Sequence, residues 1–93
     1  MRNIYNSALK SFMHYKILNA RYDLNLTQYK MAEYLAMDPR SYANIDNGTS
    51  LCSTVTFVLF LIYVCKDPYK LIDEIRDYLE EVKRNAGWYR IWT

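Results

Sequence analysis

Apolar side chains recur along the chain at helical intervals. In segment Asn3–Tyr22 they are spaced mostly three or four residues apart, which puts them on one face of a helix. Segment Pro68–Asn85 has the most regular stripe, and this stripe consists of Leu71, Ile72, Ile75, Tyr78, Leu79 and Val82. Segment Val55–Cys65 is almost continuously apolar and partly β-branched, but no second strand is evident to pair with it. The pattern therefore predicts a helix in each of the three segments.

Polar N-cap residues, two of them followed by proline, mark where four helices begin. These caps are Thr27, Asp38-Pro39, Ser53 and Asp67-Pro68. The second helix is predicted over Thr27–Leu35, the third ends at Asn47-Gly48, and the fourth runs through about Val64. Between the first two helices, Asn25 is expected to adopt a left-handed turn conformation.

Composition fits one helical domain. The chain has 93 residues, of which 52% are hydrophobic, and only two are glycine and two proline. So apolar a composition excludes a disordered chain, and so few turn residues argue against a sandwich or barrel. We expect an all-α fold of five helices in a single domain, residues 1–93, with the second and third helices at 27–48 and a C-terminal helix and aromatic tail at 68–93.

Several classes of function are disfavoured. Segment Met1–Ser11 is polar and lacks the apolar core of a signal peptide, and the 11 residues of Val55–Cys65 fall short of the roughly 18–20 that a membrane span needs. Cys52 and Cys65 are expected to be free thiols, which points to the cytoplasm. Because His14 is the only histidine and no nucleophile–base pair or phosphate loop is recognisable, we expect no metal, no cofactor and no enzyme activity.

Segment Leu24–Ser50 holds two short capped helices with a tight connection, which is a helix-turn-helix pattern. It resembles the phage-repressor (Xre/Cro-like) helix-turn-helix family, whose signature runs Leu-Thr-Gln, Ala, Leu-Gly, a second helix and Glu-x-Gly. The matching residues are Leu26-Thr27-Gln28, Met31-Ala32, Leu35, Tyr42, Ile45 and Gly48. Ile17, Ala20 and Arg21 extend the resemblance to about Ile17–Cys65, half of the chain.

The resemblance implies a lambda-repressor-like DNA-binding domain whose third helix enters the major groove. The protein would then be a sequence-specific transcriptional regulator, a repressor or an autoregulating antitoxin that acts by occluding its operator. Arg40 has the donors to pair with guanine, and Asn44 with adenine. The candidate DNA-binding residues are Thr27, Gln28, Lys30, Pro39, Arg40, Ser41 and Asn44, with weaker candidates at Tyr29, Asn47, Thr49 and Ser50. A role as helix caps alone would also explain Thr27 and Asp38.

The resemblance also implies structural roles. Arg21 and Asp46 occupy positions that form an ion pair in the family, and Gln28 would brace the start of the third helix. Ala36 stands where the family places glycine, and a left-handed alanine there would cost about 1 kcal/mol. Three further tyrosines are expected to pack in the protein rather than to stack on bases. They are Tyr63, Tyr69 and Tyr78.

Charge is unevenly distributed. The formal net charge is +2, but residues 19–50 hold three basic against four acidic residues, whereas Arg2, Lys10 and Lys16 meet no acid before Asp23. DNA affinity would therefore depend on the first helix and on homodimerisation. The stripe of the fifth helix and the segment Trp88–Trp92 are the candidate dimer or toxin contact, the alternative being packing on the first and fourth helices. A protein-interaction module that has lost DNA binding is the competing function.

Overall fold

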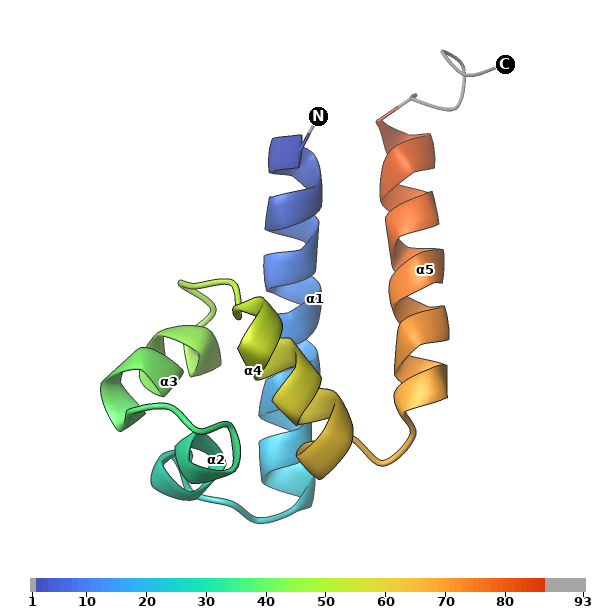
Figure 1. Ribbon diagram of the computed structural model, residues 1–93. Helices are drawn as coiled ribbons and strands as arrows, with labels where there is room; N and C mark the ends of the chain where they lie inside the picture. Colours follow the sequence, from blue (N-terminus) through green and yellow to red (C-terminus); the bar gives the residue numbers. More distant parts are fainter. Residues whose placement is uncertain (1, 87–93) are drawn as a thin grey trace.

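The computed structural model describes residues 2–86, and within this range the fold is compact and every element of regular secondary structure is a helix (Figure 1). A π-helical turn, η1, continues directly from the fourth helix. The elements are α1 (Arg2–Asp23), α2 (Gln28–Tyr34), α3 (Pro39–Asp46), α4 (Thr54–Leu59), η1 (Phe60–Val64) and α5 (Pro68–Asn85). The five predicted helices are thereby confirmed. Among these residues, no helix is both long and apolar enough to cross a membrane.

All four predicted N-caps are confirmed by their hydrogen bonds. In each case the cap side chain accepts a bond from the backbone N–H three residues further on, which satisfies a donor that the helix itself cannot. The pairs are Thr27 with Lys30 (3.1 Å), Asp38 with Ser41 (2.9 Å), Ser53 with Thr56 (3.2 Å) and Asp67 with Lys70 (3.1 Å).

Among residues 2–86, three adopt the left-handed backbone conformation, and each follows the end of a helix. They are Asn25 (φ 54°), Ala36 (φ 53°) and Gly48 (φ 80°). The prediction for Asn25 is confirmed. Ala36 is also left-handed, and it stands where the family that the sequence resembles places glycine. The N–H of Met37 donates to the carbonyl of Ala32 at 3.0 Å, which closes the turn between α2 and α3.

The π-helical turn differs from the prediction in helix type and not in extent, since the fourth helix was predicted to run through about Val64. The N–H of Cys65 donates to the carbonyl of Phe60 at 2.8 Å, a bond five residues long. Periodicity does not distinguish this turn from an α-helix, because Phe60 and Val64 point to the core in either case. Cys52 and Cys65 are free thiols, as predicted.

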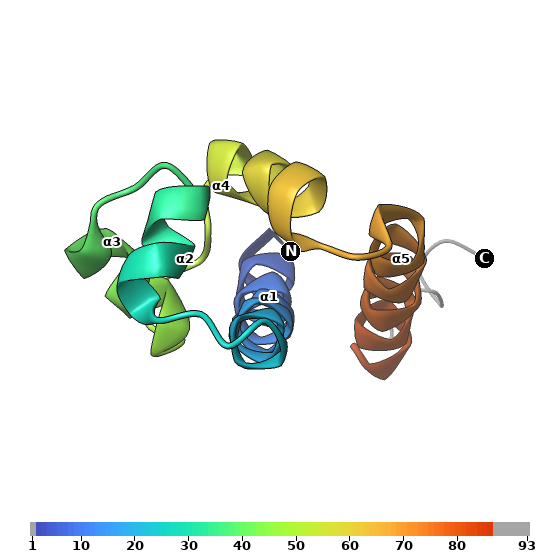
Figure 2. The same cartoon turned by 90° about the horizontal axis from the view of Figure 1, so that it is seen from below.

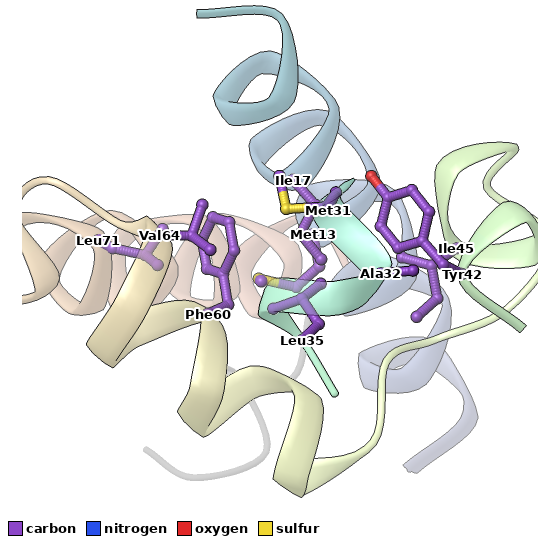
Figure 3. Close-up of a cluster of buried hydrophobic side chains, with 10 residues drawn as sticks. All are labelled: Met13, Ile17, Met31, Ala32, Leu35, Tyr42, Ile45, Phe60, Val64 and Leu71. Carbon is purple, nitrogen blue, oxygen red and sulfur yellow. The ribbon is translucent and has the colours of Figure 1, made fainter. Parts of the chain in front are cut away.

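The core lies where α1, α2, α3 and η1 meet (Figure 3). Its buried side chains are Met13, Ile17, Met31, Ala32, Leu35, Tyr42, Ile45, Phe60, Val64 and Leu71. Met31, Ala32 and Leu35 in and after α2, and Tyr42 and Ile45 in α3, match the family signature, and all five are among these buried residues. Ala32 is 1% exposed between the helices, where a small side chain allows close packing.

Helix α5 runs antiparallel to α1, on the side of α1 away from α2 and α3 (Figures 1 and 2). The ring of Tyr78 meets Phe12 edge-on, with 5.2 Å between centroids, and Lys16 forms an ion pair with Glu74. The apolar stripe of α5 therefore packs within the chain, which favours the intramolecular alternative for this helix. The segment Trp88–Trp92 lies outside the described residues.

Three residues predicted to be buried are exposed instead. Ile72 belongs to the predicted stripe but faces solvent, and Tyr63 and Tyr69 do not pack as expected. Because α5 contacts α1 along one side only, the edge of its stripe stays in water. Tyr78 is the one tyrosine of the three that packs as predicted.

Candidate nucleic-acid interface

One face of α3 is buried and the opposite face is open to solvent. Its exposed residues include the predicted base-contact positions, which are Pro39, Arg40, Ser41 and Asn44. Tyr42, Ile45 and Asp46 point inward. Arg40 and Asn44 are one helical turn apart, so the helix itself brings their side chains to the same face.

Arg40 differs from the other two cations of residues 19–50. Arg21 is bound to Asp46, and Lys30 lies 3.0 Å from Glu33. Arg40 has no ion pair with any residue that the structure describes. Its guanidinium therefore stands in solvent at the first turn of α3, with no carboxylate partner among residues 2–86.

The hydroxyl of Ser41 is committed to the N-cap of its own helix. Its Oγ donates to Asp38 Oδ2 at 2.8 Å, and its backbone N–H donates to Asp38 Oδ1 at 2.9 Å. The backbone bond is the main reason why the pKa of Asp38 lies below its usual value. On this face the hydroxyl oxygen of Ser41 can therefore accept a hydrogen bond, but its hydrogen is already donated to the adjacent carboxylate of Asp38.

A buried polar network joins α1, α2 and α3. Asp46 accepts from Arg21 Nε at 2.9 Å, from Gln28 Nε2 at 2.8 Å and from the hydroxyl of Tyr42 at 2.8 Å. A second Arg21 nitrogen reaches Asp46 Oδ2 at 3.2 Å, and Arg21 also donates to the carbonyl of Leu26 at 3.1 Å. The side chains of Arg21 and Asp46 are only 12% and 6% exposed. The predicted ion pair is confirmed, and its bidentate geometry is the strong form of an arginine–carboxylate pair.

The prediction for Gln28 is wrong in its location. Its side chain holds Asp46, at the C-terminal end of α3, and not the start of that helix. The reason is that the carboxylate of Asp46, already drawn inward by Arg21, is the strong acceptor within reach of the α2 N-terminus. Gln28 is partly buried, and one of its two N–H donors is bound to Asp46.

Protonation of the network follows from its burial and hydrogen bonds. Burial by itself would raise the pKa of Asp46, but the bonds from Arg21, Tyr42 and Gln28 together outweigh it and hold that pKa below its usual value. The bond to Asp46 is the main cause that raises the pKa of Arg21. Burial, and then the bond to Asp46, raises the pKa of Tyr42. The pair stays ionised near neutral pH, and Tyr42 keeps its proton. The bond from Tyr42 to Asp46 was not predicted from the sequence, although the spacing of four residues between them on one helix was a signal for it.

Some of the candidate DNA-binding side chains at the start of α2 and in the loop after α3 already form bonds within the protein. Thr27 is exposed and its hydroxyl oxygen accepts the cap bond from Lys30, which leaves the hydroxyl proton free to be donated. Lys30 is exposed and held by Glu33. Thr49 Oγ1 donates to the carbonyl of Asn44 at 2.9 Å and so stabilises the end of α3. Tyr29, Asn47 and Ser50 are exposed.

Lys10 and Lys16 of α1 have different surroundings. Lys16 pairs with Glu74 on α5, away from α2 and α3, so it is not free to add positive charge beside α3. Lys10, in contrast, lines a shallow recess together with Thr49 and Leu51, next to the loop that follows α3.

These positions form a polar, exposed surface on α3, flanked by the start of α2 and by Lys10, on a base fixed by the Asp46 network. Its chemistry is hydrogen bonding: a guanidinium, a carboxamide and hydroxyl groups lie in water on one side of the molecule.

Comparison with protein-family models, with curated proteins and with solved structures finds no match for this chain.

Proposed function

We propose that the chain is a sequence-specific DNA-binding transcriptional regulator, with α2 and α3 as a lambda-repressor-like helix-turn-helix and α3 as the helix that enters the major groove. The observation that carries the proposal is the open face of α3. There Arg40 stands without an ion-pair partner in the described part of the chain, one turn from Asn44, on a helix anchored by Asp46. A rigid helix with exposed, hydrogen-bonding side chains is what reading of base edges requires.

The side chains suggest which base edges they read. Arg40 presents two parallel donors to guanine O6 and N7, and Asn44 pairs with adenine N6 and N7. The two residues are about 6 Å apart along the helix axis, at 1.5 Å per residue, and base pairs are stacked about 3.4 Å apart. We therefore expect a guanine and an adenine within about two base-pair steps of each other. Ser41, whose hydroxyl donates its hydrogen bond to Asp38, would accept a hydrogen bond from an amino group of adenine or cytosine.

Phosphate contacts would come from the flanks of α3. The free N–H groups at the start of α2 and the hydroxyl proton of Thr27 suit a phosphate oxygen. Lys30 would exchange Glu33 for a phosphate, and Lys10 lies beside the loop after α3. With so few cations, one copy would bind DNA weakly. The binding constant would also depend little on salt, because the slope of log K against log salt is only about −0.9 per neutralised phosphate. A homodimer on two half-sites would supply the affinity, and operator occlusion by this dimer would repress transcription or autoregulate an antitoxin operon.

The test is selection of bound duplexes from a random DNA pool, followed by titration of the selected sequence. We expect Arg40→Ala to weaken binding by about 1–3 kcal/mol and to relax the preference at one position. Arg76→Ala is the matched control, because it removes an exposed arginine from α5, on the other side of α1. If the two variants lost the same binding free energy, the loss would reflect the removal of one positive charge and not a contact of Arg40 with a base. Absence of any binding at about 50 mM salt, with the helices intact, would overturn the proposal.

The second candidate is a protein-interaction module on the same fold. Two observations favour it: Asp38 places a carboxylate at the first turn of α3, and Tyr29 is 74% exposed on α2. A toxin or another protein would then contact the surface that we assign to DNA. The DNA selection separates the two functions, because an interaction module would retain no duplex from the pool.

A further inference from the structure

A groove with apolar walls lies between α1 and α5, and the segment 51–57 closes it on a third side. Its volume is about 340 Å³, and no charged side chain of residues 2–86 lines it. Its large apolar wall residues are Leu9 and Met13 of α1, Leu51 and Phe57 of the segment 51–57, and Ile75 and Leu79 of α5. Only Met13 among these six is fully buried. The α1–α5 groove is therefore an incomplete edge of the core, which a further apolar group can cover.

The place where α5 ends argues for the occupant of the groove. Because α1 and α5 are antiparallel, α5 ends beside the start of α1, at the end of the molecule nearer to Leu9 and Leu79 (Figure 1). Along the helix, Leu79 lies about 10 Å and Ile75 about 16 Å from Ala86, at 1.5 Å per residue. The seven residues that follow Ala86 in the sequence are Gly-Trp-Tyr-Arg-Ile-Trp-Thr. An extended chain spans about 3.3 Å per residue, so Trp92 can reach about 20 Å from Ala86, which is far enough to enter the groove.

The sequence at the end of α5 favours a reversal of the chain. Ala86 is the C-cap of α5, so Gly87 occupies the next position, where glycine commonly takes the left-handed conformation that turns the chain back. In this arrangement the residue after the glycine packs against an apolar residue three or four positions before the C-cap. Trp88 and the half-buried Val82 have this spacing. Leu79 lies three residues before Val82 on the same face of α5, so a chain that turns back over Val82 leads into the groove.

The attachment of this segment selects it over a second copy or another apolar partner. A segment joined by a short linker is present at its site at an effective concentration on the order of millimolar, whereas a separate chain would have to reach that concentration in solution. The polar lining also suits tryptophan. A buried indole N–H needs an acceptor, and Ser53 and Thr54 line the groove with hydroxyl oxygens.

We propose that residues 87–93 turn back at Gly87 and dock in the α1–α5 groove, with Trp92 as the anchor and Trp88 over Val82. Of the two roles that the sequence leaves open for the segment Trp88–Trp92, the proposal chooses packing within the chain. Docking completes the core on the α5 side of the molecule. It does not rest on DNA binding, because the groove contains no residue of α3, and so its test is separate from that of the proposed function.

The first experiment uses intrinsic fluorescence, because Trp88 and Trp92 are the only tryptophans of the chain. In Trp88→Phe, which leaves Trp92 as the sole emitter, we expect a blue-shifted emission and protection from acrylamide relative to the same protein in urea. Both should be unchanged between about 1 and 100 μM protein, because an intramolecular contact does not depend on concentration. Emission as in urea, or a blue shift that is lost on dilution, would overturn the proposal.

Two variants of α5 in the Trp88→Phe background test the location of the contact. Leu79→Lys should shift the emission to the red and raise the acrylamide quenching constant at least about twofold, because it places a charge in the wall of the groove. Ile72→Lys is the matched control: it makes the same kind of change at a 49% exposed residue of α5 outside the groove, and it should leave both readings unchanged. Far-UV circular dichroism shows whether each variant is folded. Equal effects of the two folded variants would contradict the docking.

A cross-link tests the same contact without altering the groove. Cys52 lines the groove, whereas Cys65 lines a separate recess beside Lys66 and Lys70. In Thr93→Cys, which keeps both tryptophans, mild oxidation should join the new thiol to Cys52 of the same chain in preference to Cys65, as peptide mass mapping would show. This result decides the matter even if Leu79→Lys does not fold. A cross-link mainly to Cys65, or mainly between two chains, would show that the segment does not dock in this groove.

Discussion

Removal of the carboxylate at the centre of the buried network is expected to destabilise the protein severely. Asp46→Ala leaves the guanidinium of Arg21, itself almost buried, without a counter-ion, and it takes an acceptor from Gln28 and Tyr42. Breaking a buried ion pair from one side costs about 3–5 kcal/mol. Single hydrogen bonds to a charged group contribute about 1.5–3 kcal/mol each, but bonds that share one acceptor are not additive. We therefore expect a loss of about 4 kcal/mol, set against a total stability of roughly 5–15 kcal/mol for a typical domain.

Urea unfolding, followed by far-UV circular dichroism at pH 7, measures this loss. For a small domain with a slope of about 2 kcal/mol per M, the midpoint should fall by about 2 M. Asp77→Ala is the matched control, because the side chain of Asp77 is 75% exposed on α5 and its removal should change stability by less than about 0.5 kcal/mol. A loss below about 1 kcal/mol for Asp46→Ala would refute the reasoning, since it would mean that water replaces the carboxylate at no cost.

The same network makes stability depend on pH in a defined direction. Folding lowers the pKa of Asp46 from its usual 3.8, so its contribution is complete above pH 4 and is lost as the pH falls through the lower, folded value. The gap in stability between the wild type and Asp46→Asn should therefore be largest near neutral pH and should close in acid. The other carboxylates are the same in the wild type and in the variant, so their effects on stability cancel in the difference. A gap that stays constant from pH 7 to pH 2 would contradict the assignment.

Three smaller changes test local geometry by thermal unfolding. Ala36→Gly should raise Tm by about 4–8 °C, because glycine adopts the observed φ of 53° at about 1 kcal/mol less cost; a lower Tm would show that the turn is not strained. Gly48→Ala should lower stability by more than about 1 kcal/mol, since φ is +80° there and the new Cβ would lie 3.2 Å from the ring of His14. Thr27→Ala should cost about 1 kcal/mol through loss of the N-cap, whereas Thr27→Ser should restore it.

The candidate site was predictable from sequence as far as helix geometry determines it. Because Tyr42 and Ile45 are apolar, the opposite side of α3 must carry Arg40 and Asn44, and the structure places them in solvent there. The state of each donor was not predictable in this way. The proton of Ser41 is used by Asp38, and one Gln28 donor is used by Asp46, 18 residues further along the chain. The bond of Ser41 is local to its N-cap, whereas the bond of Gln28 depends on which side chains the fold brings within 3 Å.

The amino-acid sequence by itself determined the features that arise within one helix or one turn. The N-caps, the left-handed residues Asn25 and Ala36, and the inward side of α2 and α3 all follow from interactions over three to five residues. The tertiary structure alone decided which apolar faces are covered. It pairs Lys16 with Glu74 across 58 residues, leaves Ile72 in water, and exposes the outer face of α4–η1. The physical reason is that helical periodicity specifies which residues share a face, whereas the burial of that face depends on how far the neighbouring helix extends over it.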